Sequence, residues 1–391
     1  MKTKILSILC TRPSAIKMAP IVHALKNNSN FESIVCVTGQ HREMLDQVLN
    51  LFEIIPHYDL NIMKENQDLY SVTTSVLNSL KTVLNDVKPD CILVQGDTTS
   101  TMASALAAFY QKIPVMHVEA GLRTHDIYAP FPEEVNRAMT TRIAHYHFAP
   151  THIAKQNLIR ENIDDKHIFV TGNTVIDALL WARNKVNHQS DWSDSIGCDV
   201  QNLIHQHKKI ILITGHRREN FGDGFKNTCT ALKILAERNP DWHFIYPVHL
   251  NPNVQKPVND MLSNIPNFYL TKPLEYAPFV YLMDKAKIII TDSGGIQEEA
   301  PSLGKPVLVT RAVTERPEGV LAGVVVLVGT DIQKIITETE GLMHDENRYA
   351  TMSAIANPYG DGQSAARIVA ILERVFNITS MEPSYATDFV Y

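Results

Sequence analysis

The chain has 391 residues, of which 45% are hydrophobic and 7% aromatic, so it can bury a substantial core and is long enough for two domains. Its 42 acidic and 36 basic residues give a formal net charge of -6 without long blocks of one sign, which argues against nucleic acid and anionic membranes as main partners. The apolar run before Arg12 is too short for a secretion signal, and no later run approaches the length of a membrane span. We therefore expect a cytoplasmic protein.

Short β-branched runs alternate with helical patterns along the first half of the chain, as in repeated βαβ units with a parallel sheet. The predicted strands are residues 4–10, 33–39, 91–97, 113–121, 145–150 and 168–174. The predicted helices between and after them are residues 41–52, 71–87, 99–112, 133–144 and 175–184. Cys10, Cys36 and Cys91 lie within strand-like runs, as buried small hydrophobes do, and the five cysteines suggest neither a disulfide framework nor a metal-binding pair.

A polar, weakly patterned segment follows, and we predict a linker near residues 170 to 208. The alternation then restarts, with strands predicted at residues 209–215, 243–248, 267–271, 287–292, 305–310 and 323–329. The sequence thus predicts an α/β protein of two Rossmann-like parallel-sheet domains, residues 1–172 and 173–363. A last helical segment, residues 364–391, is expected to pack back on the N-terminal domain.

Polar residues fall at the carboxyl ends of these strands: Arg12, Asp97, Glu119, His216 and Ser293. Ligands bind outside the carboxyl edge of open parallel sheets, so two such sheets facing each other predict one interdomain cleft.

Asp97 and Glu119 are separated by a single βαβ step. If their strands are neighbours, the two backbones lie roughly 4.8 Å apart, and crowding of the carboxylates would let one hold a proton while the other accepts one. The alternative is a separate structural role for each, with Asp97 capping the helix that follows it.

The segment from Thr291 to Pro306, TDSGGIQEEAPSLGKP, passes from a β-branched run through Gly294 and Gly295 into a helix. Such a turn can bring backbone N–H groups close to a phosphate, although it is neither a GxxxxGK[ST] loop nor a GxGxxG fingerprint. Glu299 lies one turn into the helix, where it can accept from ribose hydroxyls. A plain strand-to-helix turn is the alternative.

Two further patterns have simple structural explanations. Glu133 and Arg137 stand at i and i+4 of one helix, where an exposed ion pair is the ordinary outcome. The i, i+2 histidine pairs at 145/147 and 205/207 lack a third ligand at metal-binding spacing, so they do not predict a metal site.

Several motifs then combine into a resemblance that spans nearly the whole chain. TRPSAIKMAP, TGQHREMLDQV, QGDTTST, HVEAGLRT, FPEEVNR, TGHRREN, TDSGGIQEEAPSLGKPVLV and TERPEG occur in the order seen in bacterial non-hydrolysing UDP-N-acetylglucosamine 2-epimerases, which this sequence resembles. The resemblance implies the two-domain fold of GT-B glycosyltransferases, an interdomain active site, a homodimer, and no metal or nicotinamide cofactor. It also implies reversible conversion of UDP-N-acetylglucosamine to UDP-N-acetylmannosamine for surface polysaccharides.

The same resemblance implies three groups of site residues. The acid/base and leaving-group set is Asp97, Glu119, Glu133, Arg137 and His216. The UDP-binding set is Arg12, Lys17, Phe279, Ser293, Gly294, Gly295, Glu299 and Arg316. A second, activating substrate site is matched by Gln40, His41, Glu43, Arg217 and His249, and Arg123 is expected to be structural.

The chain departs from the family pattern at four positions. Cys10 and Ser14 stand in CTRPSAIK where the family usually reads GTRPEAIK, which predicts a restricted loop and a lost charge beside Arg12. Leu274 replaces a commonly polar residue, so a nucleobase contact there must come from the backbone, and Asn66 stands where some relatives carry an arginine.

Other functions remain as alternatives. A hydrolysing epimerase that releases free N-acetylmannosamine typically carries TGTRAD, unlike the TRPS here. A GT-B glycosyltransferase or a catalytically silent sugar-nucleotide sensor is the alternative from another class. Retained Asp97, Glu119, Glu133 and His216 argue against the sensor.

Overall fold

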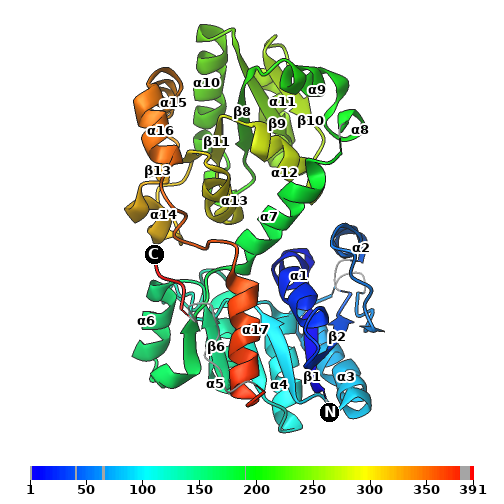
Figure 1. The fold of residues 1–391 in the computed structure, drawn as a ribbon. Helices are drawn as coiled ribbons and strands as arrows, with labels where there is room; N and C mark the ends of the chain where they lie inside the picture. Colours follow the sequence, from blue (N-terminus) through cyan, green and yellow to red (C-terminus); the bar gives the residue numbers. More distant parts are fainter. Residues whose placement is uncertain (1, 40–41, 64–66, 190, 379–387) are drawn as a thin grey trace. The chain divides into compact units, whose positions relative to one another are not determined.

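The computed structural model of the protein describes residues 2–39, 42–63, 67–189, 191–378 and 388–391. The chain divides into two compact units (Figure 1). Unit 1 comprises residues 1–178 and 359–390, and unit 2 comprises residues 179–358 with the final Tyr391.

In its described residues, unit 1 contains a seven-stranded parallel sheet in the order β3-β2-β1-β4-β5-β6-β7. Its strands are β1 (Thr3–Leu9), β2 (Phe31–Val37), β3 (Tyr58–Asp59), β4 (Cys91–Gln95), β5 (Val115–Val118), β6 (Tyr146–Ala149) and β7 (Ile168–Val170). Its helices are α1 (Arg12–Lys26), α2 (Arg42–Leu51), α3 (Leu69–Val87), α4 (Thr99–Tyr110), α5 (Glu133–Ile143), α6 (His152–Arg160) and α17 (Ser364–Val375), and α7 (Thr174–Val186) continues into unit 2.

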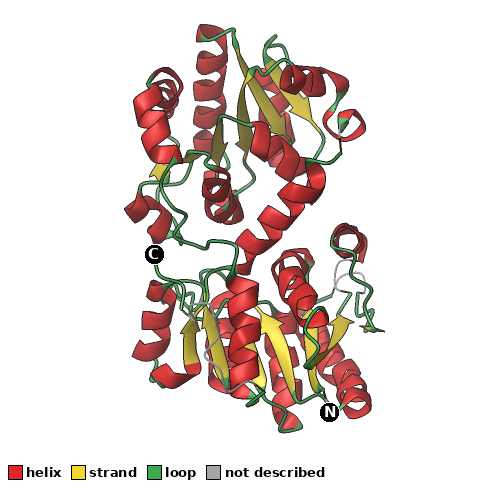
Figure 2. Cartoon of the chain, viewed as in Figure 1, coloured by secondary structure: helices red, strands yellow, loops and turns green. Residues whose placement is uncertain are grey.

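Helices cover both faces of this sheet, with α1 and α17 packed side by side on one face and α3, α4 and α5 on the other (Figures 1 and 2). A strand covered on both faces needs an apolar side chain at nearly every position, and each residue of β4 is buried. The helices bury one stripe each. In α3 the stripe includes Val72, Val76, Leu80 and Leu84, at the spacing of a helix that packs with one face.

Unit 2 contains, in its described residues, a six-stranded parallel sheet in the order β10-β9-β8-β11-β12-β13. Its strands are β8 (Lys209–Thr214), β9 (Trp242–Pro247), β10 (Phe268–Thr271), β11 (Ile288–Thr291), β12 (Val307–Val309) and β13 (Val325–Leu327). Its helices are α8 (Ser193–Ile196), α9 (Cys198–His205), α10 (Asp223–Arg238), α11 (Pro252–Leu262), α12 (Tyr276–Lys285), α13 (Gly294–Glu299), α14 (Pro317–Ala322), α15 (Ile332–His344) and α16 (Glu346–Ser353).

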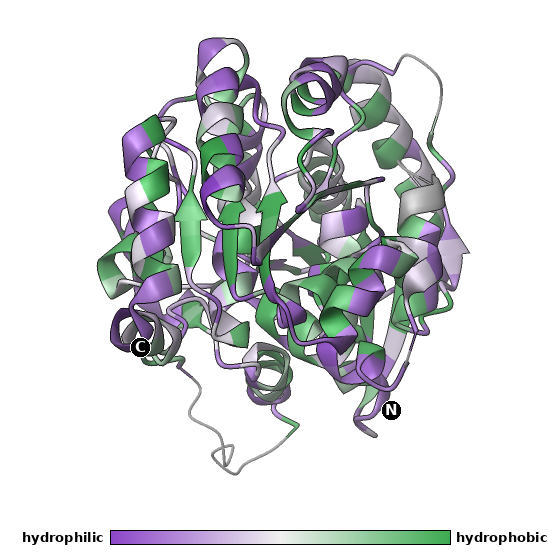
Figure 3. Ribbon diagram, turned by 90° about the horizontal axis from the view of Figure 1, so that it is seen from above, coloured by the Kyte–Doolittle hydropathy of each residue, from purple (hydrophilic) through white to green (hydrophobic). Residues whose placement is uncertain are grey.

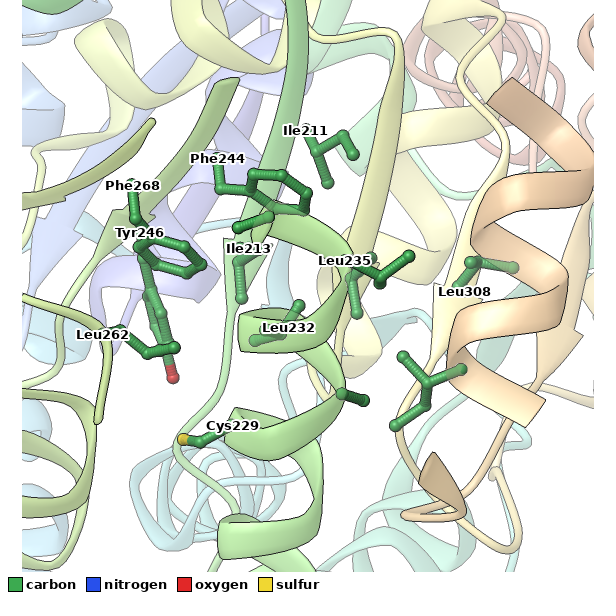
Figure 4. Close-up of a cluster of buried hydrophobic side chains, with 14 of the residues drawn as sticks. Ile211, Ile213, Cys229, Leu232, Leu235, Phe244, Tyr246, Leu262, Phe268 and Leu308 are labelled. Carbon is green, nitrogen blue, oxygen red and sulfur yellow. The ribbon is translucent and has the colours of Figure 1, made fainter. Parts of the chain in front are cut away.

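The core of unit 2 forms where side chains of β8, β9 and β11 meet the inner face of α10. Figure 4 shows Phe244 and Tyr246 of β9 beside Ile213 of β8, facing Leu232 and Leu235 of α10. Helices in Figure 3 carry hydrophilic residues on part of their circumference and hydrophobic residues on the rest, as expected for helices that cover a sheet with one face.

The predicted strand at residues 168–174 and the predicted helix at residues 175–184 are present as β7 and α7. The rest of the predicted linker is wrong, because it holds the short helices α8 and α9, which sparse apolar residues such as Ile196, Val200 and Leu203 anchor. The short strand β3, two residues long, was not predicted. The expected burial of Cys10, Cys36 and Cys91 is confirmed. No helix within the described ranges is both long and apolar enough to cross a bilayer.

Each sheet reverses its strand order once, between β1 and β4 in unit 1 and between β8 and β11 in unit 2. Loops that leave the carboxyl ends of two such strands diverge to opposite faces, which opens a crevice at that edge. The residues predicted to bind ligand follow these strands or their neighbours, except Phe279, which follows β10.

Candidate functional site

Glu119 directly follows β5, and its side chain is held by three polar partners of unit 1. The register pairs Gln95 of β4 with Val118 of β5, which confirms that the strands before Asp97 and Glu119 are neighbours. The Glu119 carboxylate accepts from Lys17 of α1 and from Gln95, and from Asn173 at 3.1 Å. Glu119 also has a φ of 61°, a conformation that is uncommon for a residue with a side chain and that clusters at functional sites.

Asp97 pairs with Arg137 of α5, whose Nη2 lies 2.8 Å from Asp97 Oδ2. The alternative that Asp97 caps α4 is wrong, because Thr98 is the cap and accepts from the Thr101 N–H. Asp97 and Glu119 therefore each have a cation of their own, where the sequence suggested two carboxylates sharing one proton.

The Arg137 ion pair differs from the predicted one. Arg137 Nη1 donates to Glu134 at 2.8 Å, one helical turn away, and its side chain is only 12% exposed. Half-buried Glu133 has no hydrogen-bond or ion-pair partner among the described residues. The expected exposed Glu133–Arg137 pair is therefore wrong, and the Glu133 carboxylate is unpaired within the described part of the chain.

Glu134 ties the loop that follows Arg123 to helix α5. Its carboxylate accepts from the N–H groups of Thr124 at 3.1 Å and His125 at 2.9 Å. Burial raises the pKa of Glu134, but these N–H groups and Arg137 outweigh it and hold the pKa below its ordinary value.

Arg123 has a structural role, as predicted. Its side chain is 2% exposed and donates to both Glu161 oxygens, to Thr141 Oγ1 and to the Leu122 carbonyl. Its donors are thus used inside unit 1.

Arg12 begins α1, and its half-buried guanidinium has no hydrogen-bond or ion-pair partner within the described part of the chain. Cys10 is not among the residues with positive φ, so its backbone conformation is one that a cysteine adopts readily, and its thiol is buried beside Thr101. Burial raises the pKa of Cys10 to about 11, so the thiol stays neutral. Ser14 is also buried, and its N–H donates to the N-cap Thr11.

His117 of β5 contacts the loop that carries Asp97. Its Nε2 lies 2.8 Å from the Gly96 carbonyl oxygen, and burial lowers its pKa to about 4. His147, its register partner on β6, has a pKa lowered to about 3, again chiefly by burial. Both imidazoles are therefore neutral parts of the core.

In unit 2, His216 follows β8 and Asp292 follows β11, at the point where the strand order reverses. The register pairs Thr214 with Thr291. Asp292 Oδ2 accepts the backbone N–H groups of His216 and Arg217, each at 2.8 Å. The His216 ring stacks on His249 with centroids 5.4 Å apart.

Cationic groups gather around the turn of Ser293, Gly294 and Gly295. A Cβ built on Gly294 would lie 3.4 Å from Glu315 Oε1, 3.6 Å from Arg217 Nη2 and 3.7 Å from Arg316 Cζ, so one carboxylate lies among the two guanidinium groups. Arg316 is held by the buried carboxylate of Glu298, and Arg217 Nη2 lies 3.6 Å from Glu315.

Glu299, the predicted ribose ligand, accepts from the Tyr276 hydroxyl at 2.8 Å. Phe279 lies on the same helix α12 as Tyr276 and is half-buried. Glu299 is thus tied to α12 through Tyr276.

The residues matched to a second substrate site are only partly described. Gln40 and His41 lie outside the described residues, as does Asn66, and Glu43 lies on α2 with its side chain undescribed. Arg217 and His249 lie beside His216.

Sequence reasoning missed several residues that bond to the predicted ones or to the residue directly before them. These are Gln95, His117, Glu134, Asn173, Tyr246, Tyr276, Asp292 and Glu298. The role of Asp292 could have been predicted, because Asp292 directly follows a β-branched strand, much as Asp97 comes shortly after β4. Asn173 and Tyr276 gave no signal, since they reach the site only through loop and helix geometry.

Comparison with known proteins gives consistent similarities. The family model described as UDP-N-acetylglucosamine 2-epimerase matches residues 23–373. The UDP-N-acetylglucosamine 2-epimerase of Salmonella typhimurium is 58% identical over 370 residues, covering 95% of this chain and 98% of that protein. The crystal structure of the Neisseria meningitidis UDP-GlcNAc 2-epimerase bound to UDP-GlcNAc is 52% identical with a TM-score of 0.85, covering 95% of this chain and 100% of that chain.

The crystal structure of the glycosyltransferase of kitacinnamycin is 12% identical to this chain, with a TM-score of 0.63. It covers 96% of this chain and 99% of that chain, which shows a likeness of fold alone. With the two parallel sheets, these similarities confirm the predicted class of two Rossmann-like α/β units of the GT-B type.

Proposed function

The chain belongs to the UDP-N-acetylglucosamine 2-epimerase family, and we propose that it reversibly converts UDP-N-acetylglucosamine to UDP-N-acetylmannosamine without hydrolysing either. The observation that carries the proposal is the pair of carboxylates at adjacent strand ends, Asp97 and Glu119, each with its own cation. The turn of unit 2, where Arg316 lies beside Gly294, is the matching group that we propose for the diphosphate.

The proposed route is elimination followed by re-addition. The C2 proton of the sugar has no neighbouring carbonyl to acidify it, so its direct abstraction would be very slow. In the proposed route UDP leaves C1 while the C2 proton is lost, giving 2-acetamidoglucal. UDP then adds back to C1 as C2 takes a proton on the opposite face.

This route requires carboxylates that move protons and cations that stabilise departing UDP. We assign proton transfer to Asp97, Glu119 and Glu133, with Arg137 holding Asp97 in place. Glu133 is suited to this task because its carboxylate has no partner among the described residues.

We assign UDP binding to two sets of cations and to the turn of unit 2. Arg12 is suited because its guanidinium has no partner among the described residues. The other proposed contacts are Lys17, His216, Phe279, Ser293, Gly294, Gly295, Glu299 and Arg316.

The test is incubation of the purified protein with UDP-N-acetylglucosamine in D₂O, without added metal or acceptor, followed by proton NMR and mass analysis. We expect UDP-N-acetylmannosamine with deuterium at C2, because the proton returned to C2 comes from groups that exchange with solvent. Free N-acetylmannosamine with UDP would indicate a hydrolysing enzyme. An unchanged, undeuterated substrate that reacts only after an acceptor sugar is added would overturn the epimerase in favour of a GT-B glycosyltransferase.

Substrate activation at a second site is also proposed, from the match of Arg217 and His249 among others. It predicts that the rate rises more steeply than first order with UDP-N-acetylglucosamine at low concentration in the same assay. A hyperbolic curve over the whole range would contradict it.

We further propose that the protein is a homodimer and supplies surface polysaccharide synthesis in the cytoplasm, on the resemblance and the composition alone. Size-exclusion chromatography with light scattering should give twice the mass of one chain at micromolar concentration. A mass of one chain under those conditions would contradict the dimer.

A further inference from the structure

Asp292 has a buried carboxylate, and only one of its two oxygens accepts hydrogen bonds from the described residues. It is 1% exposed, and its Oδ2 accepts the N–H groups of His216 and Arg217. Its Oδ1 has no hydrogen-bond partner in the described residues, yet it lies 3.5 Å from His216 Nδ1.

A buried carboxylate oxygen without a donor is costly, so Oδ1 favours any nearby N–H that can turn toward it. At 3.5 Å the contact is too long for a good hydrogen bond, but a small rotation of the imidazole closes it. The His249 ring, stacked at an interplanar angle of 17°, confines the imidazole to a plane.

The chemical consequence concerns which ring nitrogen carries the proton. A carboxylate at Nδ1 favours the tautomer with the proton on Nδ1, which leaves Nε2 free to act on a ligand. The His216 side chain is 42% exposed, so it remains open to a ligand although Asp292 is buried.

We propose that Asp292 is a positioning residue that orients His216, keeps its proton on Nδ1 and stabilises the imidazolium that assists departure of the diphosphate. This inference rests on the proposed function, in which His216 assists the leaving UDP. In the imidazolium Nε2 also carries a proton, taken up from solvent, and this N–H donates to a diphosphate oxygen as the C1–O bond breaks, while the Asp292 charge opposes loss of the Nδ1 proton.

The charges around His216 predict the direction in which its pKa changes when Asp292 is replaced. Burial lowers the pKa of His216, Asp292 raises it, and Arg217 and His249 lower it. Replacing Asp292 by asparagine removes a negative charge that raises this pKa, so the pKa must fall further.

The test is nitrogen NMR of histidine-labelled protein, with His216 assigned by its loss in H216Q. We expect the wild-type signal to show the Nδ1–H tautomer, and we expect Asp292→Asn to lower the His216 titration midpoint by about one pH unit. In the epimerase assay the same variant should lose kcat about 10²-fold. Its dissociation constant for UDP should not increase, because a negative charge near the diphosphate is removed.

The matched control is Asp177→Asn in α7. Asp177 is a half-buried carboxylate that likewise accepts two backbone N–H groups, those of Ser364 at 3.3 Å and Ala365 at 2.8 Å, and none of its partners among the described residues is an imidazole. This variant should leave the His216 signal unchanged. An Nε2–H tautomer in the wild type, or an unchanged midpoint in Asp292→Asn, would overturn the proposal. If Asp292→Asn does not fold, the wild-type tautomer alone decides. The NMR results stand even if the wild type has no epimerase activity, so failure of the positioning role and of the proposed function are distinguishable.

Discussion

Replacing Glu119 by glutamine is expected to lower kcat about 10²- to 10⁴-fold, the range typical of a lost general acid or base. Glutamine preserves the shape of the side chain and retains one oxygen for Lys17 or Asn173, but it cannot exchange a proton with C2 of the sugar. The side chain is also anchored by Gln95, so the amide should stay in place. UDP affinity should change little, since the turn at Gly294 is untouched.

The measurement is the steady-state rate in both directions together with deuterium incorporation at C2 from D₂O. If Glu119 serves one face of the sugar, Glu119→Gln loses exchange into one epimer more than into the other. Equal loss from both epimers assigns Glu119 to a step shared by the two directions. Exchange at the wild-type rate from both epimers would remove Glu119 from the acid/base set.

Glu161→Gln is the matched control for this substitution. Glu161 also lies in unit 1 and also pairs with a buried cation, since its carboxylate accepts from Arg123. The control loses a charged pair outside the proposed acid/base set, so kcat should stay within about twofold below the unfolding temperature. A comparable loss of kcat in both variants would trace the effect to the stability of unit 1.

The parts of the site that sequence reasoning located are those fixed by strand direction. All strands of a parallel sheet end at the same edge, so a polar residue directly after a strand has its position set by the alternation alone. Asp97, Glu119 and His216 were placed in this way, and the register of β4 with β5 confirms the adjacency of the first two.

The choice of partner for each charged side chain was not predictable. In PEEVNR, helical spacing allows Arg137 to reach either Glu133 at i−4 or Glu134 at i−3. The structure selects Glu134, because the loop through Thr124 and His125 returns over α5 and presents two N–H groups to that carboxylate. The sequence of this loop has no hydrophobic periodicity, so its path could not be predicted.

The restricted loop predicted at Cys10 was inferred from residue type alone, and the backbone conformation of Cys10 gives it no support. A cysteine in place of glycine restricts the backbone only where glycine's conformation is needed. Cys10 is absent from the residues with positive φ, and its side chain fills space beneath Thr101. A glycine in a family motif is needed for its conformation only where its φ is positive or where a neighbouring atom leaves no room for a Cβ.

Gly121 has both requirements, and Gly121→Ala should destabilise unit 1 by about 3–5 kcal/mol. Its φ is 92°, and a Cβ at this position would lie 2.3 Å from the Ala154 carbonyl oxygen and 3.0 Å from Leu158 Cγ. Because the nearest atom is backbone, α6 or the loop after Glu119 has to move. The Gly121 carbonyl accepts from Asn157 of α6 at 3.0 Å, so that movement also strains a buried hydrogen bond.

Gly197→Ala separates the cost of the backbone conformation from the cost of the clash. Gly197 has a φ of 91°, but no atom lies within 4 Å of its built Cβ, so alanine there should cost only about 1–3 kcal/mol. The two units can be followed separately, because Trp181, Trp192 and Trp242 all lie in unit 2. Gly121→Ala should lower the midpoint of a urea transition seen by circular dichroism while the tryptophan transition stays near that of the wild type, and Gly197→Ala should lower the tryptophan midpoint. Equal losses of stability in the two variants would mean that α6 moves aside at no cost in free energy. The positive φ alone would then explain the loss of stability in Gly121→Ala.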